Sequence, residues 1–79
     1  MVNLYFSDRF ENDTFIATCQ EGFVMKYIQD FINKCNENKP HKFVMYYIRT
    51  WKDESNDKKT WIDVGSHSEF FYTIEVTNE

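Results

Sequence analysis

The sequence predicts an α+β two-layer sandwich in which one amphipathic helix packs on an antiparallel sheet. Three observations support this: apolar residues alternate near both ends of the chain, they recur every three or four residues in the middle, and short polar connections join the last segments. The predicted order is strand, strand, helix, strand, strand, strand. A length of 79 residues corresponds to one domain over 1–79.

The first two strands are expected to form a hairpin. Residues 2–7 alternate, which places Val2, Leu4 and Phe6 on one face of the strand. A polar stretch follows, with Asn12-Asp13 as a turn, and a second β-rich run begins at residue 14 and continues to 18. The turn residues between two apolar runs predict antiparallel pairing of these segments.

The helix is predicted over about 19–37. Thr18 and Glu21 fit a capping box, in which the Thr side chain accepts from the Glu21 N–H and the Glu side chain reaches back. Asn36, Asn38 and Pro40 end the pattern. One apolar stripe follows helical spacing and faces the core. It comprises Val24, Ile28, Phe31 and Cys35, widened by Tyr27 and Ile32.

The two cysteines are expected to remain free thiols. Cys19 and Cys35 both fall in the predicted helix, about 24 Å apart at about 1.5 Å per residue. A disulfide needs Cα atoms within about 7 Å. The first residues lack the basic segment and apolar run of a signal peptide, and no stretch reaches the ~20 apolar residues of a membrane span. A cytoplasmic protein is therefore expected.

The last three strands are expected to form a meander because their connections are short. The segment 42–52 is apolar on both faces and predicts a central strand buried on each side. Shorter alternating strands follow over 60–64 and 69–77. Their register stays open: either Phe70, Tyr72 and Ile74 face the helix, or Phe71 and its neighbours in the alternation do.

An unusually high aromatic content, 19% of residues, points to an interface. The helix covers only one face of the sheet, so the other face is expected to carry several of Tyr46, Ile48, Trp61, Phe71 and Tyr5, with Arg49 nearby. The alternative is that loops, the N-terminal strand and the twist of the sheet cover these rings. Tyr46 and Trp61 come onto neighbouring positions if the register pairs their strands. Exposed apolar patches of more than a few hundred Å² mark interfaces, and Tyr, Trp and Arg dominate their energetics. Tyr46, Trp61, Phe71 and Arg49 are the predicted partner-binding residues of this face.

The net charge of −4 disfavours direct binding to nucleic acid and to anionic membranes, which need clustered Lys and Arg. It leaves basic protein partners open, including nucleic-acid-binding proteins. Asp8, Glu11 and Asp13 lie in one predicted loop with carboxylates spaced like phosphates, and we include them in the partner-binding set. Two alternatives are a nucleic-acid-binding module that uses the aromatic and basic residues of 42–62, and a structural homodimer.

No motif predicts catalysis, a metal site or a cofactor. Ser66, His67, Ser68 and Glu69 are neighbours on a turn, without a Gly-x-Ser-x-Gly elbow. The cysteines and histidines lack the paired spacing of zinc ligands. The chain is therefore expected to be a non-enzymatic binding protein.

In size, acidity and richness in Asn, Lys and aromatic residues the chain is similar to small proteins of bacteriophages and mobile elements, anti-CRISPR proteins among them. This similarity implies an inhibitor that binds and blocks a host defence factor or another nucleic-acid-binding protein. Its place of action would then be the cytoplasm of the host cell.

Overall fold

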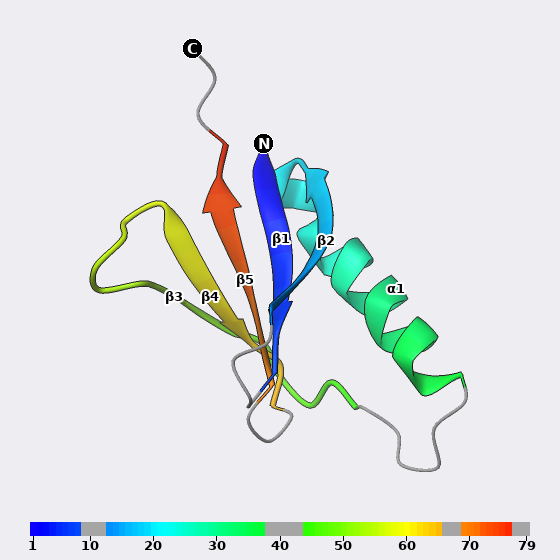
Figure 1. Cartoon of the computed structure of the whole chain (residues 1–79). Helices are drawn as coiled ribbons and strands as arrows, with labels where there is room; N and C mark the ends of the chain where they lie inside the picture. The colour runs from blue at the N-terminus through cyan, green and yellow to red at the C-terminus, as the bar shows by residue number, and fades with distance from the viewer. Residues whose placement is uncertain (9–12, 38–43, 66–68, 77–79) are drawn as a thin grey trace.

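A computed structural model describes residues 1–8, 13–37, 44–65 and 69–76. It contains a five-stranded antiparallel sheet in the order β2-β1-β5-β4-β3, with one helix packed against one face (Figure 1). The predicted α+β two-layer arrangement is confirmed, as are the N-terminal hairpin and the C-terminal meander. The elements are β1 (Val2–Ser7), β2 (Asp13–Cys19), a 3-10 turn η1 (Glu21–Phe23), α1 (Val24–Asn36), β3 (Arg49–Lys52), β4 (Lys59–Asp63) and β5 (Phe70–Glu75).

β1 lies inside the sheet and pairs with β2 on one side and with β5 on the other. Val2 and Leu4 alternate with half-buried positions and are 1% and 0% exposed, as the sequence pattern predicts. The register between β1 and β2 shifts between Leu4 and Tyr5, which marks a β-bulge. This bulge leaves Tyr5 opposite Phe15.

The helix begins later than predicted. Thr18 belongs to β2, where its hydroxyl donates to the Asn3 side chain at 2.5 Å, so it does not cap the helix. Gln20 precedes η1, and α1 starts only at Val24. Cross-strand pairing of Thr18 with Asn3 competes with the local capping signal and prevails. The helix 19–37 is thus shortened at its first turn.

The revised boundary changes the argument about the cysteines. Cys19 is buried at the end of β2, whereas Cys35 lies near the end of α1, so the two do not share a helix. The predicted separation of about 24 Å along one helix, from which we excluded a disulfide, is therefore wrong. Both cysteines are nevertheless free in the structure.

The core lies between α1 and the face of the sheet formed by alternate residues of β1, β5 and β4. The helix contributes Val24, Ile28 and Ile32, so Ile32 rather than Phe31 follows Ile28 in its buried stripe. Phe31 packs beside them, with its ring centroid 4.9 Å from that of Phe6. The buried cluster comprises Val2, Leu4, Cys19, Val24, Ile28, Ile32, Ile62, Val64 and Phe71.

Phe71 was predicted on the partner-binding face, and this is wrong. It is 0% exposed and its ring lies 5.3 Å from Phe6 and 5.8 Å from Phe31, centroid to centroid. β5 takes the register in which Phe71 and Thr73 face the helix and Tyr72 faces away. Both positions are aromatic, so alternation alone did not decide between them.

The predicted central strand over 42–52 is also wrong. β3 has four residues, all exposed, and lies at the edge of the sheet. Residues 44–48 are not in a strand: the Tyr46 and Tyr47 N–H groups both donate to the Val64 carbonyl, at 2.9 and 3.4 Å. Two donors on one acceptor break the alternation that a ladder needs. Residues 42 and 43 lie outside the described residues.

Gly65 permits this close approach after β4. Its φ of +87° lies in the left-handed region, and a Cβ at this position would meet the Tyr47 ring at 2.9 Å. Only glycine adopts this conformation without strain or displacement. The turn thereby holds the segment 44–48 against the end of β4.

Replacing Phe71 with Ala should largely unfold the domain. Large-to-small changes at buried Phe cost about 3–5 kcal/mol, and small domains have total stabilities from about 5 kcal/mol. Thermal unfolding followed by circular dichroism measures the effect. The matched control is Phe15→Ala, because Phe15 is 55% exposed. Similar midpoints for the two variants would contradict the register described for β5.

Candidate protein-binding surface

The face of the sheet opposite α1 carries a row of aromatic rings that crosses all five strands. Consecutive members are directly paired in the register, from Phe15 on β2 through Tyr5, Tyr72 and Trp61 to Trp51 on β3. Ring centroids are 5.5 Å apart for Phe15–Tyr5, 4.9 Å for Tyr5–Tyr72 and 5.1 Å for Tyr72–Trp61. We call these five residues the aromatic row.

Phe70 connects the last two members. Its ring lies 6.1 Å from Trp61 and 6.3 Å from Trp51, edge to face in both cases. Such contacts between aromatic pairs contribute about 0.5–1.5 kcal/mol beyond the area that they bury. The row therefore stabilises a face of the sheet that no helix covers.

Two polar atoms of the aromatic row donate to carboxylates. The Trp61 Nε1–H donates to Asp53 at 2.8 Å, and the Tyr72 hydroxyl donates to Asp13 at 2.6 Å. The bond from Trp61, with further bonds from Ser55, lowers the pKa of Asp53. Burial and the neighbouring Asp13 raise the pKa of Tyr72. These carboxylates hold the rings in place.

Two cations lie over the rings. Lys59 Nζ is 4.3 Å from the centroids of both Trp61 and Tyr72. The Arg49 guanidinium is 5.4 Å from the Tyr47 ring and 5.9 Å from the Trp51 ring. Both cations lie within the distance at which ring faces attract positive charge. The rings of Trp61 and Tyr72 are thus already contacted by a side chain of the same chain.

Arg49 and Tyr47 are held by Asp63, which is 6% exposed. The Arg49 Nη2 donates to an Asp63 oxygen at 2.7 Å, and the Tyr47 hydroxyl donates to the same oxygen at 3.3 Å. The Gly65 N–H donates to the other oxygen at 2.9 Å. The hydrogen bond from Arg49 is the main cause of the lowered pKa of Asp63.

Exposed apolar side chains gather in one part of the chain, at the β3 edge of the sheet. Five of the nine exposed large hydrophobic residues among those described lie between 44 and 51. Tyr46 is the most exposed, at 73%. We call this set the edge strip; it comprises Val44, Tyr46, Tyr47, Ile48 and Trp51. Exposed apolar groups scattered singly are common, but a contiguous set is typical of an interaction site.

The structure brings only some of the predicted aromatic site residues together. Trp61 lies on the helix-free face as expected, and Arg49 lies beside it on the edge strand. The register does not bring Tyr46 next to Trp61, because Trp61 pairs with Trp51 and the Tyr46 N–H donates to the Val64 carbonyl. A six-residue loop between Lys52 and Lys59 was the signal that could have identified the Trp51–Trp61 pair.

The predicted acidic loop is divided. Asp8 is half-buried after the end of β1, and Asp13 begins β2 and accepts from Tyr72. Glu11 lies outside the described residues. Asp13 is therefore not a free carboxylate spaced for a phosphate-binding partner, because it is bonded to the sheet.

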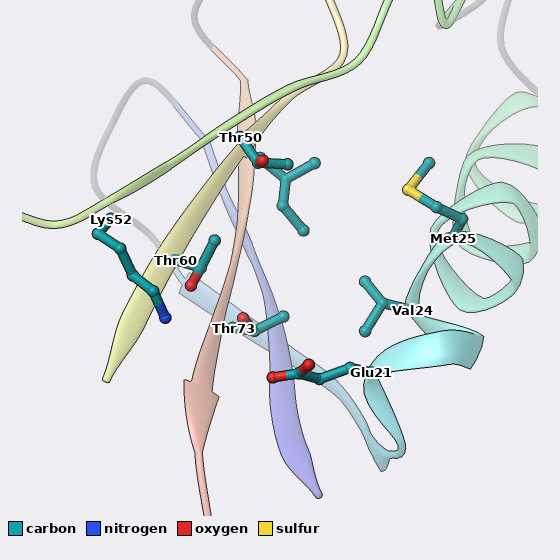
Figure 2. Close-up of a pocket in the computed structure, with 8 residues that line it drawn as sticks. Glu21, Val24, Met25, Thr50, Lys52, Thr60 and Thr73 are labelled. Atoms are coloured by element: carbon teal, nitrogen blue, oxygen red, sulfur yellow. The ribbon is translucent and has the colours of Figure 1, made fainter. Parts of the chain in front are cut away.

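A shallow groove of about 310 Å³ lies on the helix side, between the first turn of α1 and strands β3 to β5. Figure 2 shows Thr50, Thr60 and Thr73 on the sheet side, with Lys52 on β3 and Glu21 on η1 at its two sides. Val24, Met25 and Ile62 complete the lining. The helix leaves this part of the sheet uncovered because it packs against the β1 and β2 side (Figure 1).

Among residues 1–8, 13–37, 44–65 and 69–76, no three His, Cys, Asp or Glu side chains are grouped as ligands for a metal ion. Both histidines lie outside that part of the chain. The described helix is also too short and too polar to cross a bilayer. Comparisons with protein-family models, curated proteins and solved structures found no match. The fold and surface define the chain as an α+β two-layer domain with one helix-free, aromatic sheet face.

Replacing Arg49 with Gln should lower the thermal midpoint at pH 7, since Asp63 then loses its main donor. Asp63 has a lowered pKa in the folded state, so its contribution is present above the unfolded pKa of about 3.9 and is lost as pH falls further. The difference between the two proteins should therefore shrink below pH 4. A difference that stays constant from pH 7 to pH 2 would show that Asp63 is not the partner that matters.

Proposed function

We propose that this chain is a non-enzymatic protein-binding module whose contact surface is the edge strip together with Arg49. The observation that carries the proposal is the concentration of exposed hydrophobic residues between 44 and 51. Tyr, Trp and Arg are the residue types that most often dominate binding energy at protein interfaces. Here Tyr46, Tyr47, Trp51 and Arg49 lie within six positions of one another.

The way these side chains are held supports binding by contact. Tyr47 and Arg49 are both bonded to the buried Asp63, so part of their conformational freedom is lost before a partner arrives. Preorganised side chains lose less entropy on binding, which raises affinity without new contacts. Large aromatic groups provide much contact area for little lost rotamer freedom. The edge strip thus combines exposed apolar area with partial rigidity.

We further propose that the partner is a protein and that it is basic, because the chain carries a net charge of −4. In size and composition the chain is similar to small inhibitors of phages and mobile elements. An inhibitor that blocks a host defence or nucleic-acid-binding protein in the host cytoplasm is the biological role that this similarity supports.

The alternative is a nucleic-acid-binding module that uses Trp61 and the basic residues beside it. Its specific support is the position of Lys59 and Arg49 over aromatic rings. The same geometry counts against it, because bases stack on free ring faces and Lys59 contacts both Trp61 and Tyr72. A nuclease treatment separates this alternative from the protein partner.

Replacing Tyr46 with Ala should abolish partner capture and leave the thermal midpoint unchanged, because this side chain is 73% exposed. Tagged wild-type chain and variant are incubated with extract of the native host, with and without nuclease, and captured proteins are quantified by mass spectrometry. Truncating an interface hot spot costs about 2–4 kcal/mol, about thirty-fold to a thousand-fold in affinity.

The matched control is Tyr27→Ala, which removes an exposed tyrosine from α1, away from the edge strip. Wild type and Tyr27→Ala should capture the same protein. Equal capture by the Tyr46→Ala variant would overturn the assignment of this surface. Loss of all binding on nuclease treatment would favour the nucleic-acid alternative instead.

A further inference from the structure

The outer side of β3 presents backbone groups that pair with no described strand. β3 is the last strand in the sheet order. The Asp53 N–H donates to the Lys59 carbonyl at 2.9 Å, so the backbone of Asp53 points at β4. Backbone direction alternates along an antiparallel strand, which turns Trp51 and Arg49 toward β4 as well. The N–H and C=O groups of Thr50 and Lys52 therefore point away from the sheet.

The pairing of β4 with β5 indicates the same direction for the backbone groups of β3. The Glu75 N–H donates to the Lys58 carbonyl at 3.0 Å, so the backbone N–H and C=O groups of the even-numbered residues 58, 60 and 62 point toward β5. The backbone groups of the odd-numbered residues Lys59 and Trp61 then point toward β3, in agreement with the hydrogen bond from the Asp53 N–H to the Lys59 carbonyl. An edge with free backbone groups and apolar neighbours is a template for pairing with another strand.

We propose that this edge binds β3 of a second copy of the chain, antiparallel, with Trp51 on the two-fold axis. Residues that face each other across an antiparallel pair lie on the same face of the sheet. With Trp51 opposite Trp51 of the second copy, Thr50 meets Lys52 and Arg49 meets Asp53. The outward groups of Thr50 and Lys52 then exchange backbone hydrogen bonds with their counterparts.

Charge complementarity selects this register. Arg49 and Asp53 both lie on the helix-free face: Arg49 contacts the Trp51 ring, and Asp53 accepts from Trp61. The Arg49 side chain is 66% exposed and uses Nη2 for Asp63, which leaves other guanidinium donors for a second carboxylate. The axis generates this ion pair twice, and no like charges face each other.

The two neighbouring registers lack this match. An axis at Thr50 places Arg49 opposite Trp51 and Tyr47 opposite Asp53, and an axis at Lys52 places Trp51 opposite Asp53. Neither forms an ion pair between the copies. The register at Trp51 also continues the aromatic row from one sheet into the next. Opposite-charge and aromatic cross-strand pairs both stabilise antiparallel strands.

The dimer goes beyond the proposed function. The two surfaces share Trp51 and Arg49, but the dimer also needs backbone groups that partner binding does not use. Partner binding was assigned to exposed side chains of the edge strip, whereas the dimer depends on the backbone of Thr50 and Lys52. Thr50→Pro should therefore prevent dimerisation. Proline removes an N–H that points away from β4, and edge strands tolerate it there. Tyr46→Ala keeps that N–H and should still dimerise, so failure of one proposal does not imply failure of the other.

Sedimentation over a range of concentrations tests the dimer directly. Wild type should approach twice its mass of 9.6 kDa at high concentration, and Thr50→Pro should remain at one mass. The thermal midpoints of the two proteins should agree at concentrations at which wild type is monomeric. Wild type that stays monomeric at every concentration would overturn the proposal. Dimers that persist in a folded Thr50→Pro protein would overturn it too, because pairing would then use another surface.

Oxidative cross-linking tests the register and remains informative if Thr50→Pro fails to fold. Single cysteines are introduced on a Cys35→Ser background, in which Cys19 is buried. Trp51→Cys should form a covalent dimer, because residues at a non-hydrogen-bonded pair have Cα atoms about 4.5 Å apart. Thr50→Cys is the matched control and should not cross-link, since its counterpart is Lys52. The reverse result would overturn the axis at Trp51.

Discussion

The sheet has two faces and the described chain has one helix to cover them. α1 packs against β1, β2 and the adjacent side of β5, where Val24, Ile28 and Ile32 meet Leu4 and Phe71. The opposite face must be shielded from water by side chains of the sheet itself. A domain of this size buries only about 60–65% of its unfolded surface, so unshielded apolar strands are costly. The aromatic row is the solution that this sequence adopts.

The same constraint explains where the charges lie. Carboxylates on the helix-free face each accept from an aromatic or cationic side chain: Asp13 from Tyr72, Asp53 from Trp61, and Asp63 from Tyr47 and Arg49. Hydrogen bonds to charged groups contribute more than those between neutral groups. Part of the acidic character of the sequence is therefore structural. The net charge of −4 overstates how much free carboxylate a basic partner would meet.

Local pattern predicted the type and order of the elements, but not all of their boundaries and not their register. Alternation in β1 and helical spacing in α1 are strong because polar and apolar residues separate cleanly. In β5, Phe71 and Tyr72 are both aromatic, so either face could have been the inner one, and only contact with Phe6 and Phe31 decides. Thr18 fits a capping box, but its side chain is bonded to Asn3, which is distant in sequence, and it does not cap the helix. Both failures arise from non-local contacts.

The aromatic character of the candidate surface could be predicted from the sequence, but the positions of its residues only in part. A helix-free aromatic face followed from the composition, and Trp61 and Arg49 were placed on the strands where they occur. The apolar character of segment 42–52 predicts a buried central strand, but the same hydrophobicity also fits contact with a partner. In its described part, most of the large apolar side chains are exposed, and the turn at Gly65 with the two hydrogen bonds to Val64 keeps residues 44–48 out of a strand.

Exposure at an edge has a further consequence for β3. Natural sheets usually protect an edge strand with proline, a bulge or charged side chains, which disfavour pairing with another chain. Arg49 and Lys52 supply charge here, but Asp53 follows at the position that pairs with Arg49 about a two-fold axis. Within the described residues, the dimer that we propose would thus bring opposite charges together at this edge, where a protected edge would bring like charges together. A short, four-residue strand limits the strength of that pairing, which suits reversible association better than a permanent assembly.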